Sequence, residues 1–151
     1  MDAFDADVLI YAAVPAHALG RRVLALFSDE PARDAMAPAG VGSMLLLPEL
    51  LTKPTRDQAD SELVALAALL ARLDLRPLDE ATAELAVALG AAYGLRAADA
   101  VHLATAVGVG ADRFLTNNHR DFPQTITEID ITYPDQLLEP DGARTTQAND
   151  R

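Results

Sequence analysis

The sequence predicts an α/β fold: a single domain with a central, mostly parallel sheet of four to five strands and helices on both faces. Short apolar runs alternate with longer segments of helical spacing, which indicates strand–helix–strand crossover units. The 151 residues show no internal repeat, and they suffice for one domain with a substantial core. We expect a domain over residues 1–138 and a flexible tail over residues 139–151, which contains no apolar residue beyond single alanines.

The first elements are a short strand that ends at Asp5 and an apolar helical segment that reaches Tyr11. Pro15 ends this segment, and residues 16–27 place apolar side chains on one side of a helix. Residues 28–40 contain prolines and a glycine, which is typical of a loop.

The next apolar run, residues 41–47, predicts a buried strand. Pro48 suits the first position of a helix because its missing amide hydrogen is not needed there, and this places Glu49 in the first turn. We expect residues 52–56, which include a proline, to interrupt that helix.

Two polar residues suit the N-caps of the central helices. Ser61 precedes a leucine-rich amphipathic helix that extends towards residue 73, and Asp79 precedes an alanine-rich helix over residues 80–92. Between these helices, residues 73–78 alternate in part and predict a short strand.

The C-terminal part begins at Gly94, which is well placed to end the alanine-rich helix. Residues 97–107 have helical spacing, and residues 112–116 read as a strand. Residues 126–131 alternate as an edge strand does, and residues 134–138 predict one last helical turn.

Composition narrows the function classes. The chain has no cysteine, which excludes disulfides, thiolate chemistry and zinc fingers. Its first residues have neither the basic start nor the apolar core of a signal peptide, and no apolar run could cross a bilayer, so we expect a cytoplasmic protein with no membrane partner. The net charge of −11 argues against nucleic acid as a partner, unless a bound cation reverses the local sign.

Acidic and polar residues follow the predicted strands. Asp5 ends the first strand, Glu49 follows the second apolar run, Asp99 opens a later helix, and a cluster from Asn118 to Asp121 follows a late strand. In a parallel sheet these positions meet at one edge, where ligands bind. Carboxylates collected there repel one another unless a hard divalent cation lies among them.

Four motifs carry a family resemblance. The segments FDADVLIYAA, LLLPELL, LRAADAVHLATA and FLTNNHRDF resemble, in this order, the motifs of PIN-domain ribonucleases, and among these the VapC-type toxins of bacterial toxin–antitoxin pairs. The resemblance implies a metal-dependent endoribonuclease that hydrolyses RNA phosphodiester bonds. It further implies Mg²⁺, or Mn²⁺, as cofactor, a cognate antitoxin protein as partner, and a homodimer.

The resemblance also assigns roles to residues. Asp5, Glu49 and Asp99 match the three main acids, and Asn118 matches a position that the family fills with Asp or Asn. We expect Asp5 and Asp99 as direct metal ligands, Glu49 as a ligand through water or as the group that orients the attacking water, and Asn118 with Asp121 as the completing side.

The chain departs from the family pattern after Asp5. Ala6 and Asp7 stand where the family often has Thr or Ser and then Asn, so a hydroxyl group is missing there. We interpret Asp7 as a local cap.

Four basic residues are candidates for RNA phosphate contacts. Arg96 and Arg120 lie close to the acids in sequence, and Lys53 and Arg56 follow Glu49. Their default interpretation is solvated surface charge.

The histidines are not assigned to catalysis. His102 follows Asp99 by three residues and is interpreted as a helix-face residue, with a spacing that suits a hydrogen bond to the Asp99 region. His17 and His119 show no partner pattern.

Two alternative functions remain open. A haloacid-dehalogenase-like phosphatase would use Asp5 and Asp7, but it needs a downstream cation, and the only lysine is Lys53. A degenerate PIN module would bind a partner without cleavage, and the neutral Asn118 is its best support.

Overall fold

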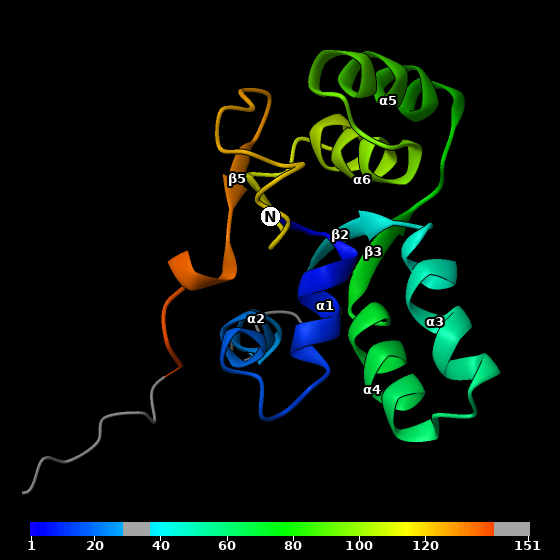
Figure 1. Ribbon diagram of the computed structural model, residues 1–151, viewed down its shortest axis with the longest axis vertical. Coiled ribbons are helices and arrows are strands. Elements are labelled where there is room, and N and C mark those ends of the chain that lie inside the picture. Colours follow the sequence, from blue (N-terminus) through cyan, green and yellow to red (C-terminus); the bar gives the residue numbers. More distant parts are fainter. Residues whose placement is uncertain (29–36, 141–151) are drawn as a thin grey trace, which may run out of the picture.

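A five-stranded parallel sheet lies between two groups of helices in the computed structural model, which describes residues 1–28 and 37–140 (Figure 1). This confirms the predicted fold class. Much of the expected loop, residues 29–36, lies outside the described residues, as do residues 141–151 of the expected tail. The division at residue 138 therefore stays a prediction.

The sheet has the strand order β3-β2-β1-β4-β5, so the first strand lies at its centre and the last at one edge. The strands are β1 (Asp2–Phe4), β2 (Gly40–Ser43), β3 (Leu73–Arg76), β4 (Arg113–Leu115) and β5 (Asp130–Thr132). All neighbouring pairs are parallel, so the carboxyl ends of all five strands lie at one edge of the sheet.

Helices cover both faces of this sheet, with α5 and α6 on one side and the other four on the opposite side (Figure 1). The helices are α1 (Ala6–Ala12), α2 (Ala18–Ser28), α3 (Leu46–Arg56), α4 (Asp60–Leu70), α5 (Glu80–Tyr93) and α6 (Ala97–Gly108), followed by the 3₁₀ turn η1 (Pro134–Gln136). Among the described residues, no helix combines the length and the apolar character that a membrane crossing requires.

Two hydrophobic cores fill the space between the sheet and the helices. Strand side chains alternate between them: Ala3 and Phe114 pack with α5 and α6, whereas Phe4 and Leu115 pack with α1 to α4. The next residue after Phe4 is Asp5, so its side chain lies on the α6 side of the sheet.

The predicted strand over residues 41–47 is too long. β2 ends at Ser43, whose hydroxyl accepts the amide hydrogen of Leu45, and α3 begins at Leu46, which is fully buried. The apolar run therefore combines a strand and a buried first helical turn, which hydrophobicity alone does not separate. Pro48 stands third in α3 rather than first, but Glu49 lies in the first turn as expected.

The expected interruption at residues 52–56 is also wrong. α3 runs through this segment with Pro54 inside it, and Pro54 is buried. Burial of the proline ring offsets part of the hydrogen bond that a proline removes from a helix. The following helix begins at Asp60, with Ala59 rather than Ser61 at the N-cap position.

The last part of the chain differs from the predicted alternation. β5 covers only residues 130–132, although Ile126 and Ile129 are buried. These two side chains fill the core from a loop, so their apolar spacing indicated burial rather than a strand. Two other expectations are confirmed: the Asp79 carboxylate accepts the amide hydrogen of Thr82, and Gly94 ends α5 with a positive φ of 65°.

Candidate active site

Three residues stand in one row at the carboxyl edge of the sheet. Asp5, Thr116 and Tyr133 directly follow β1, β4 and β5, which end in register. Two backbone hydrogen bonds continue the sheet through this row: the Asp5 amide donates to the Leu115 carbonyl at 2.9 Å, and the Thr116 amide donates to the Thr132 carbonyl at 3.2 Å. The three side chains therefore lie on the same face of the sheet, beside α6.

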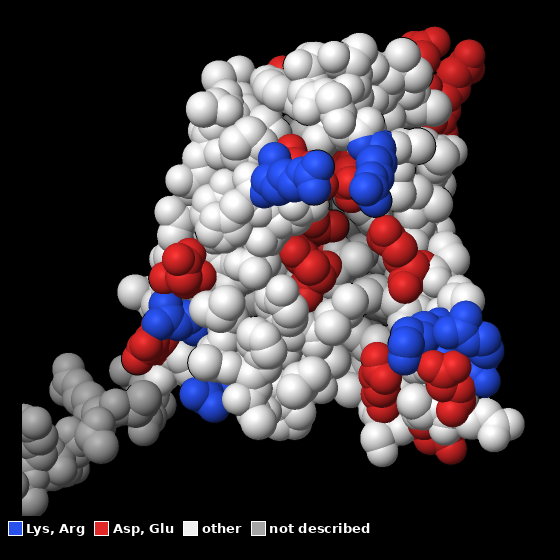
Figure 2. Space-filling model, in the orientation of Figure 1, with Lys and Arg blue, Asp and Glu red and all other residues white. Residues whose placement is uncertain are grey.

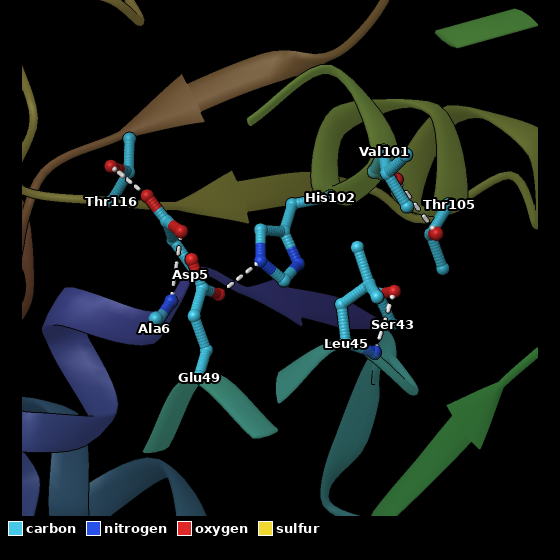
Figure 3. Close-up of polar contacts among 9 residues, drawn as sticks. All are labelled: Asp5, Ala6, Ser43, Leu45, Glu49, Val101, His102, Thr105 and Thr116. Carbon is cyan, nitrogen blue, oxygen red and sulfur yellow. Dashed lines mark hydrogen bonds and ion pairs between the residues drawn. The ribbon is translucent and has the colours of Figure 1, made fainter. Parts of the chain in front are cut away.

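Asp5 is a buried carboxylate held from two directions (Figure 3). Its Oδ1 accepts the amide hydrogen of Ala6 at 2.8 Å and so caps α1, and its Oδ2 accepts the Thr116 hydroxyl at 2.8 Å. Burial raises the pKa of Asp5, and the nearby charge of Asp99 adds to this, although His102 and the hydrogen bonds act in the opposite direction. The sequence reasoning missed Thr116, which brings a hydroxyl to Asp5 from β4.

Asp7 is not the local cap that the sequence suggested. Asp5 caps α1, whereas Oδ2 of Asp7 accepts the amide hydrogen of Asn117 at 2.9 Å and so holds the loop after β4. Oδ1 of Asp7 is buried and has no hydrogen-bond partner among the described residues. Burial and the charge of Asp5 raise the pKa of Asp7 to about 7.

Glu49 of α3 and His102 of α6 form a hydrogen-bonded pair, with Oε2 and Nε2 2.5 Å apart (Figure 3). The His102 side chain is almost fully buried, whereas 39% of the Glu49 side chain is exposed. Burial lowers the pKa of His102, but the hydrogen bond to Glu49 and the charges of Asp5, Glu49 and Asp99 outweigh burial and raise it. The expected hydrogen bond of His102 to the Asp99 region is not formed; its partner is on another helix.

Asp99 lies in the first turn of α6 and is half-buried. Burial raises its pKa, and the charges of Asp121 and Glu49 raise it further, while His102 and Arg96 oppose them. Asp99 thus interacts with carboxylates that come from α3 and from the loop after β4.

Asn118 and Asp121 bind each other in the loop that follows β4. The Asn118 amide group donates to Oδ2 of Asp121 at 2.9 Å, and the Asp121 backbone amide donates to Oδ1 of Asn118 at 3.2 Å. The Asn118 backbone amide also donates to the Thr116 hydroxyl at 3.1 Å. The side-chain carbonyl of Asn118 therefore has one lone pair left for a further contact.

The acids of this edge come close enough to influence one another but are not ready-made metal ligands. Figure 2 shows acidic side chains near the middle of one face, in and around a hollow, with basic side chains above and at the lower right. Among the described residues, no three His, Asp or Glu side chains are already grouped as a metal site. The donor atoms fit a hard cation, because they are nearly all carboxylate oxygens and Oδ1 of Asp7 is a buried acceptor without a partner.

The four candidate basic residues divide into two pairs. Lys53 and Arg56 both bind the Asp57 carboxylate, at 3.0 and 3.1 Å. Arg96 and Arg120 are exposed, and their guanidinium groups form no hydrogen bond or ion pair within residues 1–28 and 37–140. The phosphatase alternative loses support, since Lys53 is 70% exposed and bound to Asp57 instead of reaching Asp5 or Asp7.

Solved structures share the fold at low sequence identity. A chain of a toxin–antitoxin complex from Klebsiella pneumoniae superposes with a TM-score of 0.68 at 23% identity, over 89% of this chain and 98% of that one. A chain of VapBC2 from Rickettsia felis, bound to a DNA fragment from its promoter, has a TM-score of 0.63 at 14% identity. The superposition covers 87% of this chain and 97% of that one. A chain of FitAB bound to the IR36 DNA fragment has a TM-score of 0.62 at 19% identity, and the superposition covers 92% of this chain and 99% of that one.

Sequence comparison adds a family match. No curated protein sequence matches the chain. The family model of the PIN domain matches residues 3–126, a span that includes all five acidic and amide residues singled out from the sequence. PIN domains are generally nucleases that use divalent metals. The match covers most of the chain and agrees with the parallel sheet and the acids at its carboxyl edge, so this protein belongs to the PIN domain family.

Proposed function

We propose that this protein is a metal-dependent endoribonuclease that acts as the toxin of a toxin–antitoxin pair. The observation that supports it best is the raised pKa of both Asp5 and Asp99, two acids that different elements bring to the carboxyl edge of the sheet. Carboxylates with raised pKa values cluster at functional sites, where burial and neighbouring charges of the same sign are brought together. A cation among them would remove this repulsion.

The proposed site uses oxygen donors for Mg²⁺, with Mn²⁺ as an alternative. Asp5 and Asp99 are the direct ligands, Glu49 binds through water or orients the attacking water, and Asn118 with Asp121 completes the site. When bound, such a cation stabilises charge on phosphate oxygens and lowers the pKa of a bound water. His102 holds Glu49 in place by its 2.5 Å hydrogen bond, and Glu49 retains a second oxygen for water.

RNA phosphates need local positive charge on a chain whose net charge is −11. Arg96 and Arg120 are the best candidates, because they lie near Asp99 and Asp121 in the sequence and their guanidinium groups form no hydrogen bond or ion pair among the described residues. Lys53 and Arg56 contribute less, since both already bind the carboxylate of Asp57.

The proposed partners follow from the solved structures with this fold. Chains with the same fold occur in a toxin–antitoxin complex and in VapBC2. We therefore propose a small antitoxin protein as the partner of this chain. A homodimer as its assembly and the cytoplasm as its location are proposed from the sequence alone. A neighbouring reading frame that encodes a small antitoxin-like protein would support the first of these.

The direct test is digestion of single-stranded RNA by the purified protein with Mg²⁺, Mn²⁺ or EDTA. We expect cleavage only with a divalent cation, and none by Asp5→Asn or Asp99→Asn. Asp57→Asn is the matched control, because Asp57 is an exposed aspartate that pairs with Lys53 and Arg56, and it should retain activity.

Two outcomes would overturn the proposal. Cleavage that survives both substitutions at Asp5 and Asp99 would refute the site. Absence of cleavage, together with divalent-metal affinity that is equal in the wild type and Asp5→Asn, would favour the degenerate binding module. A parallel assay on a small phosphomonoester tests the phosphatase alternative.

A further inference from the structure

An exposed histidine ring lies stacked on a buried tyrosine at the carboxyl edge of the sheet. The ring centroids of His119 and Tyr133 are 3.7 Å apart and their planes differ by 12°. Tyr133 is 8% exposed, whereas His119 is exposed. One face of the imidazole is therefore covered, and its remaining surface is open to a ligand.

This stack belongs to the row that contains Asp5. Tyr133 follows β5 at the level at which Asp5 follows β1, and Thr116, which follows β4, lies between them. Two strand spacings separate Tyr133 from Asp5, or roughly 10 Å between their backbones. The stack thus lies about one nucleotide away from the proposed site of phosphodiester cleavage.

The supporting ring is rigidly held. The Tyr133 hydroxyl donates to the Phe122 carbonyl at 2.8 Å, and the Tyr133 amide donates to Oε1 of Gln136 at 2.9 Å. The His119 amide donates to the Asn117 carbonyl at 3.1 Å, which fixes the loop that carries the imidazole. A platform fixed in this way loses little conformational entropy when a ligand binds.

A second histidine–tyrosine stack in the chain shows what a purely structural pair looks like. His17 stacks on Tyr11 with ring centroids 4.3 Å apart, is half-buried, and accepts the amide hydrogen of Gly20 at 3.1 Å at the start of α2. The imidazole of His119 forms no hydrogen bond within residues 1–28 and 37–140. Local structure therefore explains His17 but leaves His119 unexplained.

Charge next to the stack points to the kind of ligand. Arg120 directly follows His119 and is exposed, and its guanidinium group has no partner in the described part of the chain. An aromatic face beside a free cation suits a nucleotide, because the ring stacks on the base while the cation binds the phosphate.

We propose that His119, supported by Tyr133, is the base-stacking platform for the nucleotide next to the cleaved phosphate. This inference rests on the proposed ribonuclease function. It implies a single-stranded substrate, because a base within a duplex is not free to stack on a protein ring. Stacking tolerates any base but favours those with the larger ring system, so purines are preferred at this position.

The test measures RNA binding, so that it does not depend on metal or on cleavage. All proteins carry Asp99→Asn, which prevents cleavage and removes one repelling charge, and all measurements are made in EDTA at low salt. The probes are a 12-nucleotide oligoadenylate and an abasic oligomer of the same length and ribose-phosphate backbone. The variants are His119→Ala, His119→Phe and Arg120→Ala.

We expect His119→Ala to weaken binding of oligoadenylate by roughly 5-fold to 100-fold and to leave binding of the abasic oligomer unchanged. His119→Phe keeps an aromatic face and should restore the affinity for oligoadenylate. Arg120→Ala should weaken binding of both oligomers by the same factor, because a phosphate contact does not depend on the base.

Equal affinity of His119→Ala and its parent for oligoadenylate would overturn the platform, and so would equal weakening for both oligomers. A parent that binds neither oligomer would also overturn it, provided that the protein without Asp99→Asn cleaves RNA in the digestion described above. Absence of that cleavage would instead count against the ribonuclease function itself, so the two failures are distinguishable.

Discussion

The imidazole of His102 and the carboxylate of Glu49 join α6 to α3 at the carboxyl edge of the sheet, with 2.5 Å between Nε2 and Oε2. The histidine is buried and the glutamate is partly exposed, so the buried partner fixes the exposed one. The raised pKa of His102 favours a positive charge among the acids. The charge of His102 correspondingly acts to lower the pKa values of Asp5 and Asp99.

Replacement of His102 should weaken metal binding through Glu49. We expect His102→Ala to lower the affinity for Mn²⁺ by roughly 10-fold to 100-fold, as the loss of groups that orient metal ligands does elsewhere. Isothermal titration calorimetry measures this affinity. His102→Gln places an amide donor near the position of Nε2 and should recover part of the lost affinity for Mn²⁺.

A double-mutant cycle distinguishes positioning from simple destabilisation. If His102 acts through Glu49, the loss caused by His102→Ala should largely disappear in a Glu49→Gln background. Additive losses of metal affinity would contradict the positioning role.

The metal-free protein should become less stable as pH rises from about 4 to 7. Asp7 has a pKa of about 7 in the folded chain and a reference pKa of 3.8, so between these pH values the folded state binds more protons than the unfolded state. The free energy of unfolding therefore falls by up to roughly 1.4 kcal/mol for each pH unit in this interval. The raised pKa values of Asp5 and Asp99 act in the same direction. The pKa of His102 is also raised, so its protonation stabilises the fold fully below pH 6.5, and this stabilisation is lost as pH rises through the pKa of the folded state.

Asp7→Asn should remove the Asp7 part of this slope. Urea unfolding in EDTA should show the variant roughly 1 to 3 kcal/mol more stable than wild type at pH 7.5, with a much smaller difference at pH 4.5. Asp57→Asn is the contrasting control, because Lys53 and Arg56 lower the pKa of Asp57 by hydrogen bonding. An Asp7→Asn effect of equal size at both pH values would contradict a titrating Asp7.

Divalent cations should stabilise the fold. At a Mn²⁺ concentration of 100 times the dissociation constant, linkage predicts a gain of about 2.7 kcal/mol in the free energy of unfolding. Thermal unfolding followed by circular dichroism should show a rise in Tm for the wild type and none for Asp99→Asn. Without metal, the Tm of Asp99→Asn should equal or exceed that of the wild type, because Asp99 is repelled by Asp121 and Glu49.

The arginines and the lysine should differ in the salt dependence of RNA binding. Arg96→Ala should weaken binding to single-stranded RNA and reduce the slope of log affinity against log salt by roughly 0.7, the value for one lost phosphate contact on a single strand. Lys53→Ala should leave the slope unchanged, because Asp57 already pairs with Lys53. Equal slopes for both variants would contradict the distinction between Lys53, which is held in an ion pair, and Arg96, which forms none among the described residues.

The sequence was informative where a local signal and the topology agree. Three positions that depend on neighbouring residues are as expected: Asp5 follows a strand, Asp99 lies in a first helical turn, and Asp79 caps a helix. The parallel sheet followed from the alternation of strands and helices.

Contacts between distant segments could not be predicted from the sequence. The bond of Thr116 to Asp5 and that of Asn117 to Asp7 join positions 111 and 110 residues apart, and no local pattern encodes them. The partner of His102 was misjudged for the same reason, because spacing within α6 pointed to Asp99 while tertiary packing brought Glu49. The predicted strand through Leu46 and the predicted helix interruption at Pro54 were wrong, because burial outweighed local propensity at both positions.

The strand order means that the surroundings of Asp5 are completed late in synthesis of the chain. β1 is made first, yet it is completed as a central strand only when β4 joins it, late in synthesis. Most of the polypeptide must be synthesised before Asp5 acquires the hydroxyl of Thr116 as its hydrogen-bond partner. A chain that stops before β4 therefore lacks the Thr116 hydroxyl that holds Asp5.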